Sequence, residues 1–304
     1  MSLYAKLKPN GPSGFGYGST AMDVTDGLDL SEKTILLTGC NSGIGLESFK
    51  VLSARGAHVV AAARTVDKAK GAGEGLSNFT PVACELSEPG SVRACVETVK
   101  ATGRRLDAII CNAGIMALPK LNTQYGYELQ FFTNHVGHFI LVTGLLDTLA
   151  ERGRVVMLSS TAHQGAPRVG IEFDNLDGSK GYFSWKAYGQ AKLANLLFAR
   201  ELARRLPHTG QTANAVHPGV IHTNLARHSG SIADIGLAMA GPLFLKSVGQ
   251  GAATQCYVAT HPSLGGVTGE YFADCNIARS SSNGKNMALA KRLWEVSEEI
   301  VAKV

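Results

Sequence analysis

Tyr188 and Lys192 stand four positions apart in a segment, residues 182–206, whose apolar residues have helical spacing. Side chains at positions i and i+4 share one face of a helix, so the phenol and the ammonium are expected to lie close together. A phenol with a pKa near ~10 is a poor catalyst at neutral pH, and a nearby cation lowers that pKa. The pair could therefore transfer a proton to or from a substrate oxygen. Tyrosine and lysine also meet at this spacing by chance, so the pattern needs support from other residues.

Two serines, Ser159 and Ser160, directly follow the apolar run at residues 154–158. This run is predicted to be a strand, which places the serine hydroxyls at its carboxyl end. A hydroxyl there can hydrogen-bond a substrate oxygen. The alternative is a serine that only caps a helix or lies in a loop. Together with Tyr188 and Lys192, the serines indicate a site for acid–base chemistry.

A turn containing three glycines follows the first predicted strand and leads into a helix. Glycine allows a tight turn, and it lets a pyrophosphate approach the helix N-terminus, where free N–H groups favour an anion. The position after a strand and before a helix favours a dinucleotide site over a purely structural turn. The turn consists of Gly39, Cys40, Asn41, Ser42, Gly43, Ile44 and Gly45.

Arg64 ends the second predicted strand, roughly 20 residues after the glycine turn, where an NAD-type site places an acid for the ribose 2′-hydroxyl. No acid is present there, and a guanidinium can pair with a 2′-phosphate instead. We therefore expect NADP(H) rather than NAD(H) as the cofactor. The alternative is a solvated arginine that does not discriminate between the two. Lys68 could assist Arg64 or could be an ordinary surface lysine.

These side chains can act together only if the fold brings them to one edge of a sheet. The chain alternates between short apolar runs, which predict strands, and segments with helical spacing of apolar residues. The predicted strands are residues 34–38, 58–63, 79–83, 106–111, 154–158 and 212–216, with a short last strand at 271–272. The predicted helices are residues 43–55, 89–102, 126–149, 182–206, 249–259 and 285–304.

Strands that are apolar throughout and alternate with helices predict a parallel sheet covered on both faces. The fold class is therefore α/β, a doubly wound parallel sheet of the Rossmann type. Residues 1–30 are rich in glycine, proline and serine and are expected to form an arm that lies over the body or is partly disordered. Nothing divides residues 31–304, which are expected to form one domain. In such sheets ligands bind at the carboxyl ends of the strands.

With these motifs in place, the chain resembles the short-chain dehydrogenase/reductase family from about Leu30 to its C-terminus. Within that family it looks similar to the retinol dehydrogenase and WW-domain oxidoreductase branch, through stretches such as residues 132–139 and 272–275. The family motifs are Thr38-Gly39, Gly43-Ile44-Gly45, Asn112-Ala113-Gly114, Asn134, Ser160, Tyr188, Lys192 and Pro218-Gly219.

The resemblance implies roles for four catalytic residues. Ser160 would polarise the substrate oxygen, and Tyr188 would be the general acid or base. Lys192 would lower the pKa of Tyr188 and bind the nicotinamide ribose. Asn134 would hold a water molecule that links Lys192 to solvent.

The resemblance also implies the cofactor contacts outside the glycine turn. Asn112 and Gly114 would contact the adenosine side, with Ala113 close by, and Thr223 would bind the nicotinamide carboxamide near the backbone of Val220. The full implied set comprises Glu85, Leu86, Asn112, Ala113, Gly114, Tyr188, Lys192, Pro218, Gly219, Val220 and Thr223.

The chain departs from the family pattern at several positions. Cys111 replaces the first asparagine of the usual NNAG stretch, and Glu85 replaces the usual aspartate, which makes its contact with adenine less certain. The glycine turn has Asn41 and Ser42 where many NADP-type members have a basic residue, so Arg64 has to provide most of the discrimination. An extra stretch, residues 164–180, separates Ser160 from Tyr188 and is expected to border the substrate entrance.

Charge and composition exclude several classes of protein. The formal net charge is +5, and no block of five or more like charges occurs, so no nucleic acid partner is expected. The six cysteines form no CxxC pair and are expected to be reduced and mostly buried. No secretory signal and no apolar run of about 18 residues is seen, so a cytoplasmic protein without a membrane span is expected. Whether the chain forms a homodimer stays open.

Two further features have ordinary alternatives. His135 and His138 lie three positions apart, but no third ligand stands at a suitable spacing, so core or interface histidines are expected and no metal site. The region around residues 225–247, including the apolar stretch 232–245, is expected to form a substrate lid. Ordinary packing or contact with a membrane or a partner are the alternatives.

The sequence therefore predicts an NADP(H)-dependent oxidoreductase that interconverts a carbonyl and an alcohol on a small to medium apolar substrate. A dinucleotide-binding sensor or scaffold with vestigial catalysis is the alternative from another class, although it would not need the complete set of Asn134, Ser160, Tyr188 and Lys192. A sugar-nucleotide epimerase of the extended branch would need a different glycine spacing and a larger C-terminal domain.

Overall fold

A single mixed sheet forms the centre of the molecule. The computed structural model describes residues 8–206, 210–221 and 245–304. Within these residues the sheet has eight strands in the order β10-β9-β8-β7-β4-β1-β2-β3, and every neighbouring pair is parallel except β9 and β10. The strands are β1 (Thr34–Thr38), β2 (His58–Ala63), β3 (Phe79–Ala83), β4 (Leu106–Cys111), β7 (Leu149–Leu158), β8 (Thr212–His217), β9 (Tyr271–Ala273) and β10 (Asn276–Ile277). A separate hairpin pairs β5 (Thr123–Gln124) with β6 (Tyr127–Glu128).

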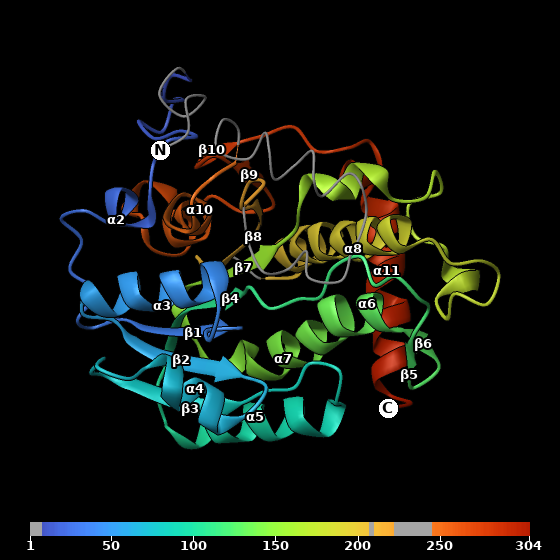
Figure 1. Cartoon of the computed structure of the whole chain (residues 1–304), viewed down its shortest axis with the longest axis horizontal. Coiled ribbons are helices and arrows are strands. Elements are labelled where there is room, and N and C mark those ends of the chain that lie inside the picture. The colour runs from blue at the N-terminus through green and yellow to red at the C-terminus, as the bar shows by residue number, and fades with distance from the viewer. Residues whose placement is uncertain (1–7, 207–209, 222–244) are drawn as a thin grey trace.

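Helices cover both faces of this sheet, as Figure 1 shows. One face is covered by α3 (Gly43–Ala54) and α10 (Val248–Thr260), with the short α2 (Ala21–Val24) beside them. The other is covered by α5 (Pro89–Ala101), α7 (Gly137–Leu145) and α8 (Ser184–Arg205). The remaining α-helices described are α4 (Val66–Ala72), α6 (Leu129–Phe131) and α11 (Met287–Val301). The predicted doubly wound α/β fold with a single domain is confirmed.

The C-terminal helix α11 packs on α8, as its amphipathic pattern indicates. Leu293 and Ile300 are buried, and the ring of Trp294 stacks on Phe198 of α8 with centroids 5.5 Å apart. The Arg205 guanidinium covers Trp294 at 4.3 Å from the ring centroid. No helix in the described ranges combines the length and apolar character needed to span a bilayer.

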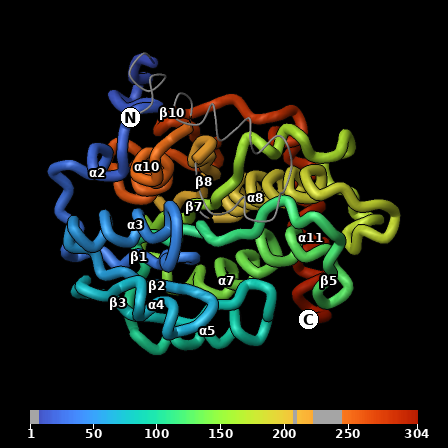
Figure 2. The backbone as a smooth tube through the Cα atoms, viewed as in Figure 1, coloured from blue at the N-terminus to red at the C-terminus, as the bar shows by residue number. Residues whose placement is uncertain are grey.

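The N-terminal arm, as far as it is described, lies against α10 and the β9–β10 hairpin (Figure 2). The side chain of Asn276 accepts a hydrogen bond from the Ser13 N–H at 3.0 Å and donates one to the Phe15 carbonyl oxygen at 3.0 Å. The Phe15 ring meets Tyr257 of α10 edge-on, with ring centroids 5.6 Å apart. The arm thus contacts the sheet edge that carries β9 and β10.

The predicted strands at 34–38, 58–63, 79–83 and 106–111 have the observed bounds, whereas two other predictions need correction. The single helix predicted at 126–149 is wrong. Gly126 has a φ of +81° and closes the β5–β6 hairpin, and the helical part divides into α6, a π-helical turn (Phe132–Val136) and α7. The strand predicted at 154–158 starts at Leu149, because it continues beside β4 across an irregularity in the ladder.

Four parallel strands end at one edge of the sheet and place the candidate residues there. Gly39 follows β1, Asn112 follows β4, Ser159 follows β7 and Pro218 follows β8. β1 lies between β2 and β4, where the strand order reverses. Ligands of doubly wound sheets bind in the crevice outside the strand ends at this switch point.

Candidate active site

Tyr188 and Lys192 lie one turn apart on the same face of α8. The Lys192 Nζ is 5.6 Å from the centroid of the Tyr188 ring. Lys192 is buried, and its ammonium donates a hydrogen bond to the Leu158 carbonyl oxygen at 3.1 Å. Burial lowers the pKa of Lys192 to about 8. The ammonium is therefore held at the end of β7, next to the phenol.

Of the two serines after β7, only Ser160 is placed for chemistry. The Ser159 hydroxyl donates to the Lys192 carbonyl oxygen at 2.7 Å and so fastens β7 to α8. The Ser160 hydroxyl lies close enough to Tyr188 to lower the pKa of the phenol, and its oxygen accepts from the Ala162 N–H at 3.2 Å. The Ser160 hydroxyl and the Tyr188 phenol can thus both hydrogen-bond to one substrate oxygen.

In the protein alone, Lys192 does not bring the pKa of Tyr188 below its ordinary value. Burial raises the pKa of Tyr188 to about 12, and the hydrogen bond with Ser160 only partly opposes this shift. Burial disfavours the charged form of a phenol. Tyr188 is therefore a neutral acid at physiological pH, ready to donate its proton rather than already ionised.

Asn134 lies in the π-helical turn between α6 and α7, and its side chain pairs with the backbone of Ile115. The Asn134 Oδ1 accepts from the Ile115 N–H at 2.8 Å, and the Nδ2 donates to the Ile115 carbonyl oxygen at 2.9 Å. A Cβ atom added at Gly114 would lie 2.9 Å from Asn134 Oδ1 and 3.6 Å from Lys192 Nζ. Asn134, Gly114 and the lysine ammonium therefore meet at one point.

A buried histidine links this cluster to the end of β1, a connection that the sequence analysis missed. His138 Nε2 lies 2.9 Å from the Thr38 hydroxyl, and its Nδ1 lies 2.9 Å from the Asn134 carbonyl oxygen. A carbonyl oxygen only accepts hydrogen bonds, so Nδ1 carries the proton. The Thr38 hydroxyl accepts from the N–H groups of Asn112 and Ala113, each at 3.0 Å, and of its two acceptors His138 Nε2 at 2.9 Å is nearer than the Ile110 carbonyl oxygen at 3.5 Å.

The neutral Nδ1–H form of His138 is also the form that burial favours. Burial lowers the pKa of His138 to about 4, although the hydrogen bond with Asn134 raises it, and the charge of Lys192 lowers it further. The signal in the sequence was the spacing, because a residue four positions after Asn134 lies one helical turn away. His135 instead bonds to Ser297 of α11 at 2.8 Å and belongs to the core.

The glycine turn brings β1, α3 and the end of β4 into close contact. Gly39 has a φ of +71°, a left-handed conformation that favours glycine. A Cβ at Gly45 would lie 2.1 Å from the Gly39 carbonyl oxygen and 2.5 Å from Asn112 Nδ2. Asn112 Nδ2 donates to the Thr38 carbonyl oxygen at 2.8 Å. Only a glycine at position 45 lets α3 begin so close to the strand ends.

The N-terminus of α3 can accept an anion. Its N-cap residue, Ser42, makes no side-chain cap hydrogen bond, and no acid stands in the first turn. The N–H groups of the first turn, which includes Gly43, Ile44 and Gly45, have no partner inside the helix. This arrangement suits a pyrophosphate. Asn41 precedes the cap in the same turn.

An unpartnered buried atom marks the adenosine side. Among the described residues, Asn112 Oδ1 is buried and has no hydrogen-bond partner. A buried acceptor without a partner is costly, and a ligand donor would satisfy it. Ala113 and Gly114 follow it on the same loop. The residues present therefore fit a nicotinamide dinucleotide.

Arg64 directly follows β2 at the edge of the sheet that carries the glycine turn, and its side chain is exposed. Within the described part of the chain it forms no ion pair.

Glu85 accepts from the N–H and hydroxyl of Ser87 at 3.3 Å and 3.0 Å, so its carboxylate holds the turn before α5. Leu86 is buried, and its carbonyl oxygen would lie 2.3 Å from a Cβ at Gly137 of α7.

Pro218, Gly219 and Val220 form the loop after β8 on the opposite side of the site. Gly219 has a φ of +94°, and Val220 is 51% exposed. Thr223 and most of the lid predicted around residues 225–247 lie outside the described residues.

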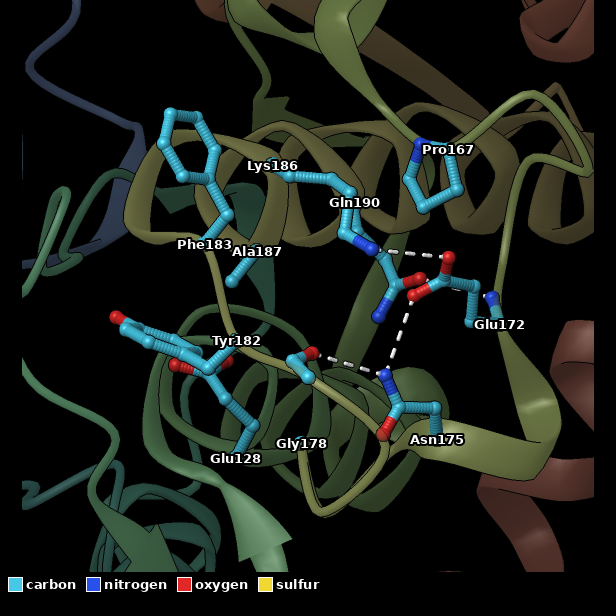
Figure 3. Close-up of a pocket in the computed structure, with 11 residues that line it drawn as sticks. Glu128, Pro167, Glu172, Asn175, Gly178, Tyr182, Phe183, Lys186, Ala187 and Gln190 are labelled. Carbon is cyan, nitrogen blue, oxygen red and sulfur yellow. Dashed lines mark hydrogen bonds and ion pairs between the residues drawn. The ribbon is translucent and has the colours of Figure 1, made fainter.

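The extra stretch at residues 164–180 packs against the first turns of α8 (Figure 3). The Glu172 N–H donates to Gln190 Oε1 at 2.8 Å, and the Glu172 carboxylate pairs with Lys186 at 3.1 Å. The cavity between them has a volume of about 20 Å³, enough for about one water molecule. It is too small to be a substrate pocket, and no group of three potential metal ligands occurs within the described ranges.

Comparisons with known proteins agree with this geometry. A family model described as short chain dehydrogenase matches residues 33–232. The chain is 44% identical to the short-chain dehydrogenase TIC 32 B, chloroplastic, of Brassica napus over 99% of both chains, and 41% identical to retinol dehydrogenase 12 of Mus musculus over 91% of this chain and 89% of that one. It is 36% identical to a WW domain-containing oxidoreductase of Danio rerio, covering 95% of this chain and 73% of the relative.

Solved structures show the same architecture. A crystal structure of a Mycobacterium paratuberculosis protein has a TM-score of 0.75 at 31% identity, covering 92% of this chain and 97% of that one. A Brucella melitensis short-chain dehydrogenase/reductase has a TM-score of 0.66 at 21% identity, covering 81% and 96%, and supports the fold alone.

The chain belongs to the short-chain dehydrogenase/reductase family. It is an oxidoreductase of that family, and the family implies a nicotinamide dinucleotide cofactor. The predicted resemblance to the retinol dehydrogenase and WW-domain oxidoreductase branch is confirmed.

Proposed function

We propose that the protein is an NADP(H)-dependent carbonyl reductase or alcohol dehydrogenase that acts on small to medium apolar substrates. The observation that carries the proposal is the meeting of Ser160, Tyr188 and Lys192 at the carboxyl end of β7. In this family the bound nicotinamide supplies or accepts the hydride. The three side chains supply the proton and the charge that a carbonyl oxygen needs.

In the reductive direction Tyr188 donates its hydroxyl proton to the carbonyl oxygen of the substrate as that oxygen gains negative charge. Ser160 donates a second hydrogen bond to the same oxygen and thereby polarises it. The phenolate that remains on Tyr188 is stabilised by the Lys192 ammonium, 5.6 Å from the ring centroid. Alcohol oxidation uses the same groups in reverse, and the phenolate then takes up the hydroxyl proton.

Asn134 and His138 join the loop after β4 to the end of β1 next to Lys192. The paired hydrogen bonds between Asn134 and Ile115 fix the loop after β4. The ring of His138 then connects this loop to Thr38 below the glycine turn. A hydrogen-bonded chain thus runs from the cofactor turn to Asn134, which lies beside Gly114 near the Lys192 ammonium.

Apolar side chains beside the catalytic tyrosine support an apolar substrate. The Trp185 ring meets the Tyr188 ring edge-on, with centroids 6.0 Å apart, and is 48% exposed. Phe183, at the start of the same helix, is 64% exposed. Relatives that carry the name retinol dehydrogenase also favour an apolar alcohol or aldehyde. The preference for NADP(H) rests on Arg64 and on the absence of an acid at that position.

The test is a turnover assay with NADPH or NADH and a series of aldehydes and ketones of increasing apolar length. The proposal predicts NADPH oxidation that is fastest with apolar carbonyls and at least about tenfold lower kcat/KM with a charged analogue. A Ser160→Ala variant should lose about 10²-fold or more in kcat. Tight NADPH binding with no turnover on any carbonyl would instead favour a cofactor-binding sensor.

A further inference from the structure

Lys246 is a buried lysine outside the catalytic cluster, and it supports the loop after β8. Only 2% of the residue is exposed. Its N–H donates to the Val220 carbonyl oxygen at 2.9 Å, and its backbone forms a parallel bridge with Ile221. A Cβ at Gly219 would lie 2.5 Å from Lys246 Cδ and 2.9 Å from its Cε. The methylenes of Lys246 therefore lie directly against the Gly219 backbone.

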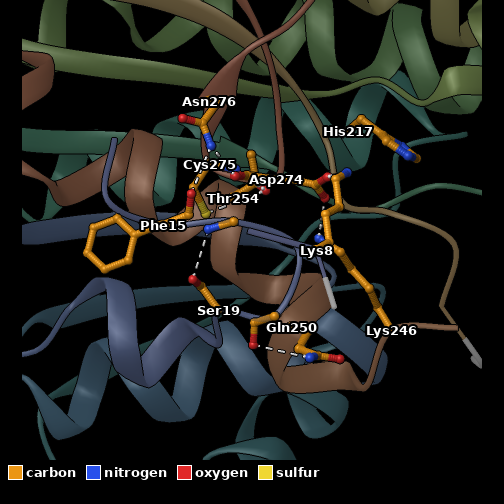
Figure 4. Close-up of polar contacts among 12 residues, drawn as sticks. Lys8, Phe15, Ser19, His217, Lys246, Gln250, Thr254, Asp274, Cys275 and Asn276 are labelled. Atoms are coloured by element: carbon orange, nitrogen blue, oxygen red, sulfur yellow. Dashed lines mark hydrogen bonds and ion pairs between the residues drawn. The ribbon is translucent and has the colours of Figure 1, made fainter. Parts of the chain in front are cut away.

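The ammonium of Lys246 is held by a carboxylate from the β9–β10 turn. Lys246 Nζ lies 2.7 Å from Asp274 Oδ1, and Lys8 Nζ of the N-terminal arm lies 2.7 Å from the other oxygen. Figure 4 shows both lysines reaching Asp274. The Lys246 ammonium also lies 4.8 Å from the centroid of the Tyr17 ring. The Lys246 side chain is fully buried whereas Asp274 is 20% exposed, so the ammonium would be left as an unpaired buried charge if the carboxylate moved away.

The turn that presents Asp274 is strained. Asp274 and Cys275 have φ values of +51° and +62° and form the two-residue turn of the β9–β10 hairpin. Two-residue hairpin turns often have positive φ at both positions, and aspartate tolerates it, whereas a cysteine adopts it at a cost. Here the Cys275 N–H donates to the Thr254 hydroxyl at 3.2 Å, and Asn276 Nδ2 donates to the Asp274 carbonyl oxygen at 2.7 Å. Strain is thus maintained at the position that brings the carboxylate to Lys246.

Resting on the proposed function, we infer that Lys246 and Asp274 are positioning residues for the nicotinamide half of the cofactor. The ion pair holds the side chain of Lys246 against Gly219, and the Lys246 N–H fixes the Val220 carbonyl. The pair thereby keeps the loop after β8 in one conformation. Arg64 and Asn112 would hold the adenosine half across the sheet edge, so its binding should not depend on this pair.

The test compares two nucleotides by calorimetry, with no turnover required. NADPH contains both halves, whereas adenosine 2′,5′-bisphosphate lacks the nicotinamide. The variant Lys246→Met keeps the aliphatic chain and removes the charge, while Asp274 retains its contact with Lys8. If the binding conformation of the loop falls to one tenth of the molecules, the dissociation constant of NADPH rises about tenfold. That of the bisphosphate should stay within about twofold.

A matched control removes an exposed lysine–aspartate pair at the other end of the sheet. Lys33 Nζ lies 2.9 Å from Asp107 Oδ1, and Lys33→Met should leave both dissociation constants unchanged. Should Lys246→Met fail to fold, the double variant Lys246→Met/Asp274→Asn replaces it, since it removes both charges of the pair, and Lys8, whose side chain is 40% exposed, can be solvated. Thermal unfolding of each variant establishes that it is folded.

The outcomes distinguish a failure of this positioning role from a failure of the proposed function. Selective weakening of NADPH supports the positioning role. Equal weakening of both nucleotides, or no weakening of either, overturns it even if the wild-type protein binds both. Wild-type protein that binds neither nucleotide overturns the proposed function and this inference with it.

Discussion

The Thr38 hydroxyl oxygen lies 2.9 Å from His138 Nε2, at the end of β1 where the glycine turn begins. Through this contact the end of β1, which carries the cofactor turn, is connected to Asn134 and so to the neighbourhood of Lys192. The two halves of the site, cofactor and acid–base chemistry, thus share a buried histidine in its neutral form. Disturbing the histidine should therefore affect both halves.

We expect Thr38→Val and His138→Phe each to lower the free energy of unfolding by about 1–3 kcal/mol, because each leaves a buried polar group without a partner. The double variant should cost less than the sum, since the two changes remove one shared hydrogen bond. Chemical denaturation of the four proteins measures this coupling. Strictly additive effects would contradict the shared bond.

NMR of ¹⁵N-labelled protein should show His138 protonated on Nδ1 only, from pH 6 to pH 8, because burial lowers its pKa to about 4. His135→Gln is the matched control for activity. It breaks the 2.8 Å bond to Ser297 in the core but leaves the contact between His138 and Thr38 intact. Its kcat should stay within about twofold of wild type, whereas His138→Phe should lose tenfold or more.

Replacing Arg64 with alanine should weaken NADPH binding about tenfold to a hundredfold, the value of a charge-assisted hydrogen bond of about 1.5–3 kcal/mol. NADH binding should change little, since NADH has no 2′-phosphate. Lys68→Ala is the matched control, because Lys68 is another exposed cation close by on α4. Fluorescence titration with both cofactors gives the two constants. Equal losses for NADPH and NADH would exclude Arg64 as the discriminating residue.

Activity should fall as pH rises above about 8. Burial lowers the pKa of Lys192 to about 8, so its ammonium is present below that pH and lost above it. Tyr188, with its pKa raised to about 12, stays protonated throughout this range. The pH profile of kcat/KM for NADPH reports the free enzyme and should show one alkaline limb. In Lys192→Arg that limb should disappear, because arginine keeps its charge; a limb at unchanged pH would assign it to another group.

A methyl group at position 45 should abolish nucleotide binding. The new Cβ would lie 2.1 Å from the Gly39 carbonyl oxygen, a rigid backbone atom, so α3 would have to move away from the strand ends. We expect Gly45→Ala to lose about 1–3 kcal/mol of stability and most of its affinity for NADPH. Gly71→Ala on α4, where nothing lies within 4 Å, should be neutral or slightly stabilising. Normal NADPH binding by Gly45→Ala would contradict the close contact.

The apolar runs in the sequence predicted most strands of the sheet, because a strand that is buried on both faces consists mainly of apolar residues. The π-helical turn at Phe132–Val136 could not be predicted, since a single wider turn leaves the apolar spacing almost unchanged. Gly126 lies in a left-handed hairpin turn, which the helical pattern concealed. These two errors concern the segment that carries Asn134.

The proposed catalytic residues were predictable from short-range motifs, whereas the supporting contacts were not. Tyr188 and Lys192 are neighbours on one helix. Lys246 and Asp274, in contrast, are brought together by the turn between β9 and β10, and no spacing in the sequence indicates this. The elevated pKa of Tyr188 also depends on burial, which only the folded chain determines.

The most direct test of the central claim is a single-turnover measurement on Tyr188→Phe, with NADPH bound and an apolar aldehyde added in a stopped-flow instrument. The variant keeps the ring and loses only the hydroxyl. The account predicts that NADPH oxidation slows by about 10²-fold to 10⁴-fold while the dissociation constant of NADPH stays within about twofold. A rate within tenfold of the wild-type value would show that another group supplies the proton.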